Sequence, residues 1–286
     1  MYEKVLILGR GIGQVMLQNN PLSGGLMLIG IACNSCLSAI LAVIGTVIST
    51  MTASVVGYEK DDIRNGLYGF NGALVGIAIG VFMEINLISI LLLIVGAILS
   101  TWIVYCFRYQ NKLPGLTAPF ILVVWLLIAG CRYLFPSLLL PSLLEMPELA
   151  IDIFRPFSLN IGQVMFQENI LSGLFFLFGV LINSRINAIY AMIGATLPLF
   201  TILYPHTNLT AWDSGLLGYN GVLCAIALGD KTRKGATKAI FSVILSIILQ
   251  ISGMQMGIVT LTAPFVLSVW LINLLTDSFP AMLRSR

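Results

Sequence analysis

Long apolar stretches, separated by short polar or helix-breaking segments, follow one another along this chain. In the first half they lie near residues 22–34, 37–56, 66–84, 85–107 and 113–131. In the second half they lie near residues 158–182, 186–204, 215–229, 236–257 and 259–276. A helix needs about 20 apolar residues to cross a bilayer. The pattern therefore predicts an all-α polytopic membrane protein with about five spans in each half, in which 9–20 and 158–168 are alternatively short re-entrant pieces.

Three motifs occur twice, in the same order. IGQVMLQNNPLSG at 12–24 returns at 161–173, GLYGFNGALVGIAIG at 66–80 returns at 215–229, and LTAPFILVVWL at 116–126 returns at 261–271. The chain is therefore read as two copies of one unit. We assign residues 1–135 to the first repeat, 136–155 to an extracytoplasmic linker rich in proline, and 156–286 to the second repeat.

The composition agrees with a membrane protein, since 58% of the 286 residues are hydrophobic and only 9% are charged. A soluble domain carries about 25% charged residues, so a water-soluble enzyme or a nucleic-acid-binding protein is excluded. The pair Cys33 and Cys36 has no histidine or second cysteine pair beside it, and we expect it to pack as small apolar side chains. We expect no metal and no cofactor.

The positive charges predict how the two halves cross the membrane. An odd number of spans per half turns the second copy upside down, and cytoplasmic loops carry the excess of Lys and Arg. Only Arg132 and Arg155 fall on the opposite side in this arrangement. Thirteen of the 15 basic residues fall on one side: Lys4, Arg10, Lys60, Arg64, Arg108, Lys112, Arg185, Lys231, Arg233, Lys234, Lys238, Arg284 and Arg286. We therefore predict inverted-topology repeats with both termini in the cytoplasm.

Inverted repeats place a substrate site near the bilayer midplane, where broken helices meet. The two LTAPF motifs predict such breaks. Thr117 and Thr262 each stand two residues before a proline, in the arrangement of a helix N-cap followed by the first turn. Each hydroxyl can cap its own helix, contact a substrate, or do both, because it donates and accepts.

The glycine-rich motifs predict close helix packing and a buried amide. Gly69 and Gly218 belong to glycines repeated at every third position, which let another backbone approach closely. Asn71 and Asn220 lie in the same apolar stretches, where an unpaired amide is costly. We interpret these asparagines as structural groups that hold a neighbouring turn in place.

Large apolar side chains follow the same asparagines. Phe70 and Leu74 are four residues apart and share a helix face, as do Tyr219 and Leu223. Such pairs usually pack in a core. Facing each other across a pseudo-two-fold axis, they can also form a flat, dehydrated slot.

Gln14 and Gln163 are the most informative polar positions, with Gln18 and Gln167 one turn further on. Each carboxamide offers an acceptor and a donor without a charge, for interhelical hydrogen bonding or for a substrate. No Asp, Lys or Arg lies deep in a predicted span, whereas ion-coupled transport usually requires one. The single histidine, His206, lies in a predicted loop. The pathway therefore suits a small neutral solute.

These paired motifs, GLYGFN at 66–71 with GLLGYN at 215–220, together with the LTAPF and GQVM pairs, closely resemble the urea transporters. The resemblance implies homotrimers with one pore per subunit, in a bacterial inner membrane. It also implies passive, channel-like conduction of urea through a narrow filter between the repeats. No nucleic acid is involved, and no nucleophile–base pair suggests an enzyme.

Carried over by position, the resemblance implies that Gln14 and Gln163 hydrogen-bond urea at the two ends of the filter, where Thr117 and Thr262 add hydroxyls. It implies an apolar slot lined by Phe70, Leu74, Tyr219, Leu223 and Val164. Leu17 departs from the family, because phenylalanine is common there, and Tyr219 stands where phenylalanine is frequent. The alternatives are a facilitator for another small neutral solute, such as ammonia or a short amide, and a non-transporting membrane scaffold.

Overall fold

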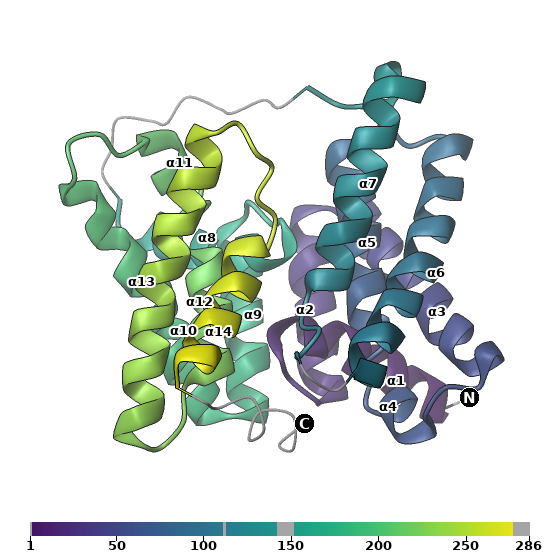
Figure 1. Cartoon of the computed structure of the whole chain (residues 1–286), viewed down its shortest axis with the longest axis horizontal. Coiled ribbons are helices and arrows are strands. Elements are labelled where there is room, and N and C mark those ends of the chain that lie inside the picture. The colour runs from purple at the N-terminus through teal and green to yellow at the C-terminus, as the bar shows by residue number, and fades with distance from the viewer. Residues whose placement is uncertain (1, 111–112, 142–151, 277–286) are drawn as a thin grey trace. The chain divides into compact units, whose positions relative to one another are not determined.

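The computed structural model describes residues 2–110, 113–141 and 152–276, and in these ranges it is built of helices, with one isolated β-bridge between Met83 and Leu139 (Figure 1). The chain divides into two compact units, Met1–Leu143 and Leu144–Arg286. Positions 142–151 of the predicted linker lie outside the described residues. So do Lys112, Arg284 and Arg286 of the charge argument.

The first unit contains α1 (Tyr2–Gly13), the 3₁₀ turn η1 (Gln14–Met16), α2 (Pro21–Asn34), α3 (Cys36–Val56), α4 (Lys60–Arg64), α5 (Gly69–Phe82), α6 (Leu87–Gln110), α7 (Ala118–Leu134) and η2 (Pro136–Leu138). The second unit contains α8 (Phe154–Gly162), η3 (Gln163–Met165), α9 (Ile170–Asn183), α10 (Arg185–Thr196), η4 (Leu197–Leu203), α11 (Leu209–Asp213), α12 (Tyr219–Leu228), α13 (Arg233–Gln255) and α14 (Ala263–Leu275).

Within the described ranges, four helical segments are long and apolar enough to cross a membrane: Cys36–Val56, Leu87–Gln110, Arg185–Leu203 and Arg233–Gln255. The remaining apolar helices are shorter, among them α5, α7, α12 and α14. Turns that contain glycine precede α5 and α12, and a proline lies in the first turn of α7 and of α14. The chain is thus a multi-helix membrane protein in which long helices alternate with short ones.

The apolar stretch predicted at 158–182 is two helices rather than one. The segment Phe154–Met165 meets Ile170–Asn183 at an angle of 71°. The chain turns because Phe166 adopts a left-handed conformation, with φ of 58°, and because the Asn169 side chain accepts from the Leu171 N–H and starts α9. The interpretation of 158–168 as a separate short piece describes this segment better.

Three helices were not predicted. The helix α1 escaped because its first residues are polar and its last turns contain three glycines, which weaken a helical pattern. The helices α4 and α11 have five residues each, too few to show a period of 3.6. All three hold groups that are important below.

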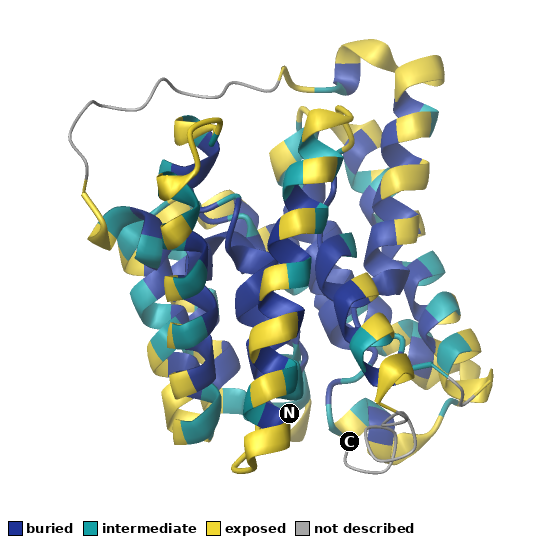
Figure 2. Cartoon of the chain, turned by 60° about the vertical axis from the view of Figure 1, so that its left-hand side comes forward, coloured by how far each residue is buried: buried dark blue, intermediate teal, exposed yellow. Residues whose placement is uncertain are grey.

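Small residues bring helices α3 and α5 into backbone contact in the first unit. A Cβ added at Gly45 would overlap the carbonyl oxygen of Gly72, and one added at Gly76 would overlap that of Leu41. Helix α5 is consequently buried from Gly69 to Ile79. Figure 2 shows the buried residues on the packed faces of the helices and the exposed residues on their outer faces.

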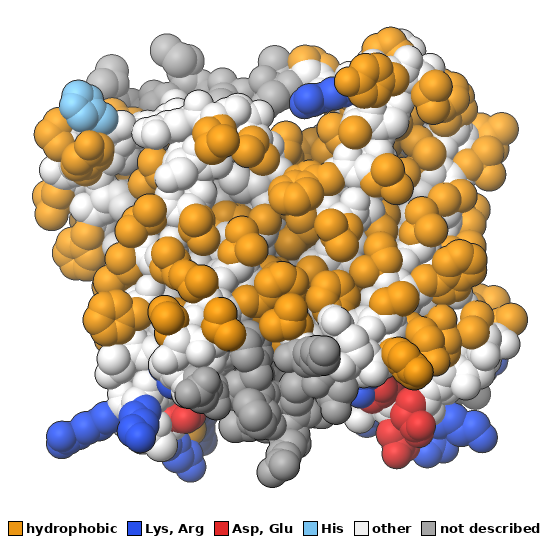
Figure 3. Space-filling view, in the orientation of Figure 1, with side chains coloured by type: hydrophobic (Ala, Val, Ile, Leu, Met, Phe, Trp, Pro, Cys, Tyr) orange, Lys and Arg blue, Asp and Glu red, His pale blue; other side chains and the backbone are white. Residues whose placement is uncertain are grey.

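The outer faces are apolar, as lipid contact requires. Leu91, Val95 and Trp102 of α6 are each about half exposed, and hydrophobic side chains cover much of the visible surface in Figure 3. In the first unit the ion pairs of Arg64 with Glu3 and of Arg108 with Asp62 lie near helix ends, and Arg132 lies in the last turn of α7. This separation of apolar flanks from charged ends is typical of a membrane-embedded helical unit.

Gly45→Ala is expected to destabilise the protein strongly, because the new methyl group would overlap backbone, which cannot move aside as a side chain can. Overpacking of this kind costs typically 1–3 kcal/mol or more. Gly25→Ala in α2 is the matched control, since a Cβ there meets nothing within 4 Å. Thermal unfolding in detergent measures both variants. Equal melting temperatures for the two would contradict the packing described for α3 and α5.

Candidate functional site

The side chains of Gln14 and Gln163 bridge a helix break to a distant turn in each unit. The Gln14 Nε2 donates to the backbone carbonyl of Asn65 at 3.0 Å, and the Gln163 Nε2 donates to that of Ser214, also at 3.0 Å. Each carbonyl lies just before a glycine with positive φ, Gly66 at 74° or Gly215 at 76°. The two glutamines are thus fixed in orientation by the same bond.

Fixing the amide nitrogen leaves the carboxamide oxygen as an acceptor. Within the described part of the chain, neither the Gln14 nor the Gln163 Oε1 has a hydrogen-bond donor. Gln14 is half-buried and Gln163 is 8% exposed. Each unit therefore presents one neutral, oriented acceptor beside a break in the backbone.

Gln18 and Gln167 have a different task from Gln14 and Gln163. Their amide groups close the turn locally, with Gln18 Nε2 donating to the Met16 carbonyl at 2.6 Å and Gln167 Nε2 to that of Met165 at 2.5 Å. Both side chains are fully buried. They hold a turn in which Leu17 or Phe166 takes positive φ, a costly conformation for a residue with a bulky side chain.

Strained leucines also precede the helices α7 and α14. Leu116 has φ of 47° and Leu261 has φ of 48°. Positive φ thus occurs at corresponding places of the two units, at the glutamine turns and before the short helices. Such strain persists only where neighbouring groups over-determine it.

Thr117 and Thr262 occupy the N-cap positions of α7 and α14, but the predicted capping by their side chains is wrong: neither side chain accepts from a backbone N–H of its helix. A capping residue usually has extended backbone. Thr117 has φ −95° and ψ 9°, and Thr262 has φ −92° and ψ 18°. Both threonines are nearly fully buried.

Asn71 and Asn220 provide the caps that the threonines do not. The Asn71 Oδ1 accepts from the Phe120 N–H at 3.0 Å, and its Nδ2 donates to the carbonyl of the strained Leu116 at 3.3 Å. In the second unit Asn220 makes the equivalent bonds, to the Phe265 N–H at 3.1 Å and the Leu261 carbonyl at 3.3 Å. Each asparagine therefore clasps the start of a short helix at two points.

The second unit has a buried hydroxyl network around Tyr219, whereas Phe70, at the same place in the first unit, has no hydroxyl. The Tyr219 hydroxyl donates to the Leu261 carbonyl at 2.5 Å. The Gln250 Oε1 accepts from Thr260 at 2.8 Å and from Asn220 at 3.0 Å. Gln250 was missed by the sequence reasoning, although a glutamine inside the apolar run ILSIILQISG is a recognisable signal.

The apolar residues predicted to line a slot are buried. Leu74, Leu223 and Val164 have no exposed surface, and Phe70 and Tyr219 are 8% and 6% exposed. The glycines beside them allow close approach. Gly69 lies against Gly11 and Thr46, and Gly218 lies against the carboxamide of Asn160, where a Cβ would overlap it.

The groups that make these hydrogen bonds are neutral, although the Asn65 and Ser214 carbonyls directly follow the ion-paired Arg64 and Asp213. Amide, hydroxyl and backbone carbonyl groups surround the helix breaks, whereas the ion pairs lie at helix ends, as in Arg108 with Asp62 and Arg155 with Asp213. Burial is the largest influence on the pKa of the Asp62 carboxyl and raises it, although the nearby Arg108 lowers it. The amide, hydroxyl and carbonyl groups at the helix breaks can replace the water around an uncharged polar solute, and they offer no counter-charge to an ion.

Known proteins are similar to this chain over most of its length. The sequence model of the urea transporter family matches residues 5–277. Urea transporter 1 of Ovis aries is 28% identical over 297 aligned residues, which cover 95% of this chain and 77% of that protein. Urea transporter 1 of Rattus norvegicus is 30% identical over 235 residues, which cover 77% of this chain and 61% of that protein.

Proposed function

Because this chain belongs to the urea transporter family, we propose that it transports urea passively across a membrane, as a channel does. A transporter of this family is not an enzyme. The observation that carries the proposal is the pair of equivalent bonds from Gln14 to Asn65 and from Gln163 to Ser214. They hold two neutral acceptors at helix breaks.

The chemistry of urea suits such groups. Urea is flat and uncharged, and its N–H donors lie in the plane of the molecule. Removing an amide from water without replacement bonds costs roughly 2–7 kcal/mol. Glutamine, threonine and backbone oxygens along one edge offset this cost, while apolar side chains cover the two faces. An ion gains no counter-charge in this setting, so the site favours a neutral solute.

The finer assignment follows from the repeats. We propose that the two units are inverted repeats and that urea passes through a filter between them. Gln14 and Gln163 accept from urea at the two ends, and Thr117 and Thr262 add hydroxyl groups. The side chains proposed to flank the flat faces of urea are Phe70, Leu74, Tyr219, Leu223, Val164 and Leu17.

The distribution of charge supports an orientation with both termini in the cytoplasm. In the first unit Lys4, Arg10, Arg64 and Arg108 belong to the end of the unit that also holds α4, and Arg10 donates to the Arg64 carbonyl. Cytoplasmic ends carry such an excess. The family resemblance of the motifs supports a homotrimer in a bacterial inner membrane, with one pore in each subunit.

Urea flux into proteoliposomes tests the proposed function. Vesicles that contain the protein are expected to shrink and re-swell in a urea gradient much faster than empty vesicles, and more slowly in acetamide or glycerol gradients. Stopped-flow light scattering measures all three. Faster recovery in acetamide than in urea would favour a facilitator for another neutral solute. Rates equal to those of empty vesicles would contradict transport and favour a non-transporting membrane scaffold.

A further inference from the structure

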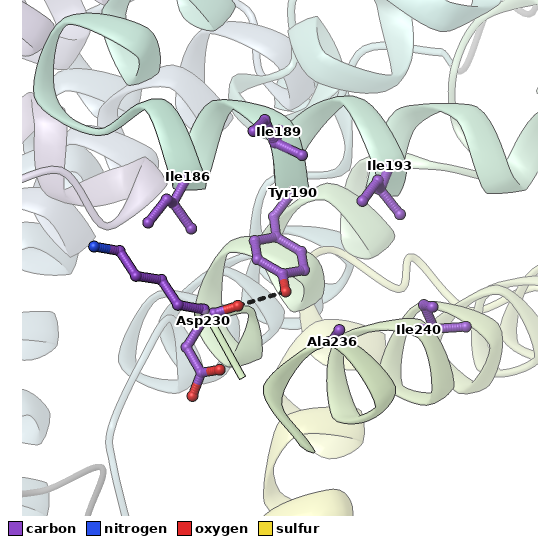
Figure 4. Close-up of a pocket in the computed structure, with 8 residues that line it drawn as sticks. Ile186, Ile189, Tyr190, Ile193, Asp230, Ala236 and Ile240 are labelled. Carbon is purple, nitrogen blue, oxygen red and sulfur yellow. Dashed lines mark hydrogen bonds between the residues drawn. The ribbon is translucent and has the colours of Figure 1, made fainter. Parts of the chain in front are cut away.

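An apolar groove of about 260 Å³ lies on the second unit between α10 and α13 (Figure 4). Three isoleucines from α10 line one side, and Ala236 and Ile240 from α13 line the other. Figure 4 shows these side chains facing one another across the groove, with the loop at Asp230 at one end. A volume of 260 Å³ is below the roughly 300–1,000 Å³ of pockets that enclose a whole small ligand. The groove therefore suits a segment of a longer chain.

Tyr190 and Asp230 shape that end of the groove. The Tyr190 hydroxyl donates to the backbone carbonyl of Asp230 at 2.7 Å, and its ring packs so closely on Gly229 that a Cβ there would overlap it. The Asp230 carboxylate accepts from the N–H and the hydroxyl of Thr232, both at 2.6 Å. These bonds hold the pKa of the Asp230 carboxyl below its usual value. The carboxylate is thus engaged within its own turn.

Basic residues stand at the mouth of the groove and close to it in the sequence. Lys231 lines it, and Arg233, Lys234 and Lys238 follow within the next seven residues, against the single carboxylate of Asp230. Lys231, Arg233 and Lys234 are exposed. A lysine at such a position can cover apolar surface with its aliphatic stem while its ammonium group stays in the polar layer.

We propose that this groove binds an anionic phospholipid, with one acyl chain between α10 and α13 and the phosphate at Lys231 and its basic neighbours. The apolar floor matches hydrocarbon, and the cationic mouth matches the phosphate. Basic pockets between membrane helices on the cytoplasmic side bind acidic head groups in this manner. A second copy of the chain fits this groove less well, because it would have to place an anionic group at the basic mouth of the groove.

The first unit offers a natural comparison, because its corresponding helix keeps the apolar floor without the charge. Ile189 corresponds to Ile40 of α3 at the spacing of 149 residues that relates the first two pairs of repeated motifs, and both side chains are about half exposed. At the same spacing, Phe82 replaces Lys231. An anionic lipid is therefore expected at the second unit alone.

Native mass spectrometry of the purified full-length protein tests the proposal, with phosphatidylglycerol and phosphatidylcholine added in separate titrations. The wild-type protein is expected to retain phosphatidylglycerol preferentially. Lys231→Gln is expected to weaken its retention about fivefold, the loss that one basic group near a membrane surface implies. Ile189→Trp fills the groove and is expected to reduce retention further. Ile40→Trp is the matched control and is expected to leave retention unchanged.

Three results would overturn the proposal: equal retention of both lipids by the wild-type protein, unchanged retention in Lys231→Gln, or equal losses in Ile189→Trp and Ile40→Trp. A change of oligomeric state in Ile189→Trp, with lipid retention intact, would instead assign this face to contact between copies of the chain. Light scattering after size-exclusion chromatography measures the oligomeric state. Urea flux measured on the same variants shows whether they are folded. If no protein conducts urea, the wild type included, the proposed transport is contradicted and the lipid site is not.

Discussion

Gln163→Leu is expected to lower urea flux about 10- to 100-fold while the protein still assembles. Leucine has nearly the shape of glutamine but offers no oxygen to urea and no donor to the Ser214 carbonyl. Losing a buried hydrogen-bond partner costs about 1–3 kcal/mol, and each 1.4 kcal/mol added to a barrier slows passage tenfold. Stopped-flow rates at equal protein density in the vesicles measure the change.

The control for this variant is Gln255→Leu, which makes the same chemical change at an exposed position near the end of α13. It is expected to leave urea flux within a factor of two. Gln14→Leu is expected to resemble Gln163→Leu, because Gln14 makes the same bond, to the Asn65 carbonyl. Normal flux in both single variants would remove the two glutamines from the pathway, although the family membership would stand.

The sequence contained enough to predict the helices and their interruptions, because both follow from local patterns. Runs of apolar residues indicated the long helices α3, α6 and α13. Threonine and proline in LTAPF placed the starts of α7 and α14 within one or two residues. Duplication strengthened each of these predictions, since two occurrences of one motif in one chain provide two readings of the same pattern.

The groups that stabilise the interruptions could not be predicted in the same way, because they act over long distances in the sequence. Asn71 caps a helix that begins 47 positions later, at Ala118. Thr117 has the residue type of an N-cap and stands at the right position, yet its backbone dihedrals do not suit a capping hydroxyl. Local propensity therefore placed the helix break correctly, but it assigned the cap to the Thr117 hydroxyl, whereas the Asn71 side chain provides it.

The two units also differ where their sequences look interchangeable. Phe70 and Tyr219 are aromatic residues at the same place in the motif, and a single hydroxyl separates them. That hydroxyl gives the Leu261 carbonyl a second donor besides Asn220, whereas the Leu116 carbonyl has Asn71. The start of α7 therefore depends on Asn71 more heavily than the start of α14 depends on Asn220.

Asn71→Leu is accordingly expected to have the largest effect on stability of any single side-chain change at the helix breaks. It removes the acceptor of the Phe120 N–H and the donor to the Leu116 carbonyl from a fully buried site. At about 1–3 kcal/mol for each buried group that loses its partner, the total is roughly 2–6 kcal/mol. For 150–250 residues each kcal/mol shifts the melting temperature by about 2–4 °C, so a fall of about 10 °C is expected.

Asn220→Leu provides the comparison, and Asn19→Leu is the control, since the Asn19 amide is exposed and bonds to the Asn65 side chain at 3.1 Å. We expect Asn220→Leu to cost less than Asn71→Leu, because the Tyr219 hydroxyl still satisfies the Leu261 carbonyl. Adding Tyr219→Phe to Asn220→Leu should remove that advantage and bring its melting temperature down towards that of Asn71→Leu. If Asn220→Leu lowers the melting temperature more than Asn71→Leu does, the hydroxyl network does not stabilise the strained turn. The Asn220 bond to Gln250 then contributes more than its bonds to Leu261 and Phe265.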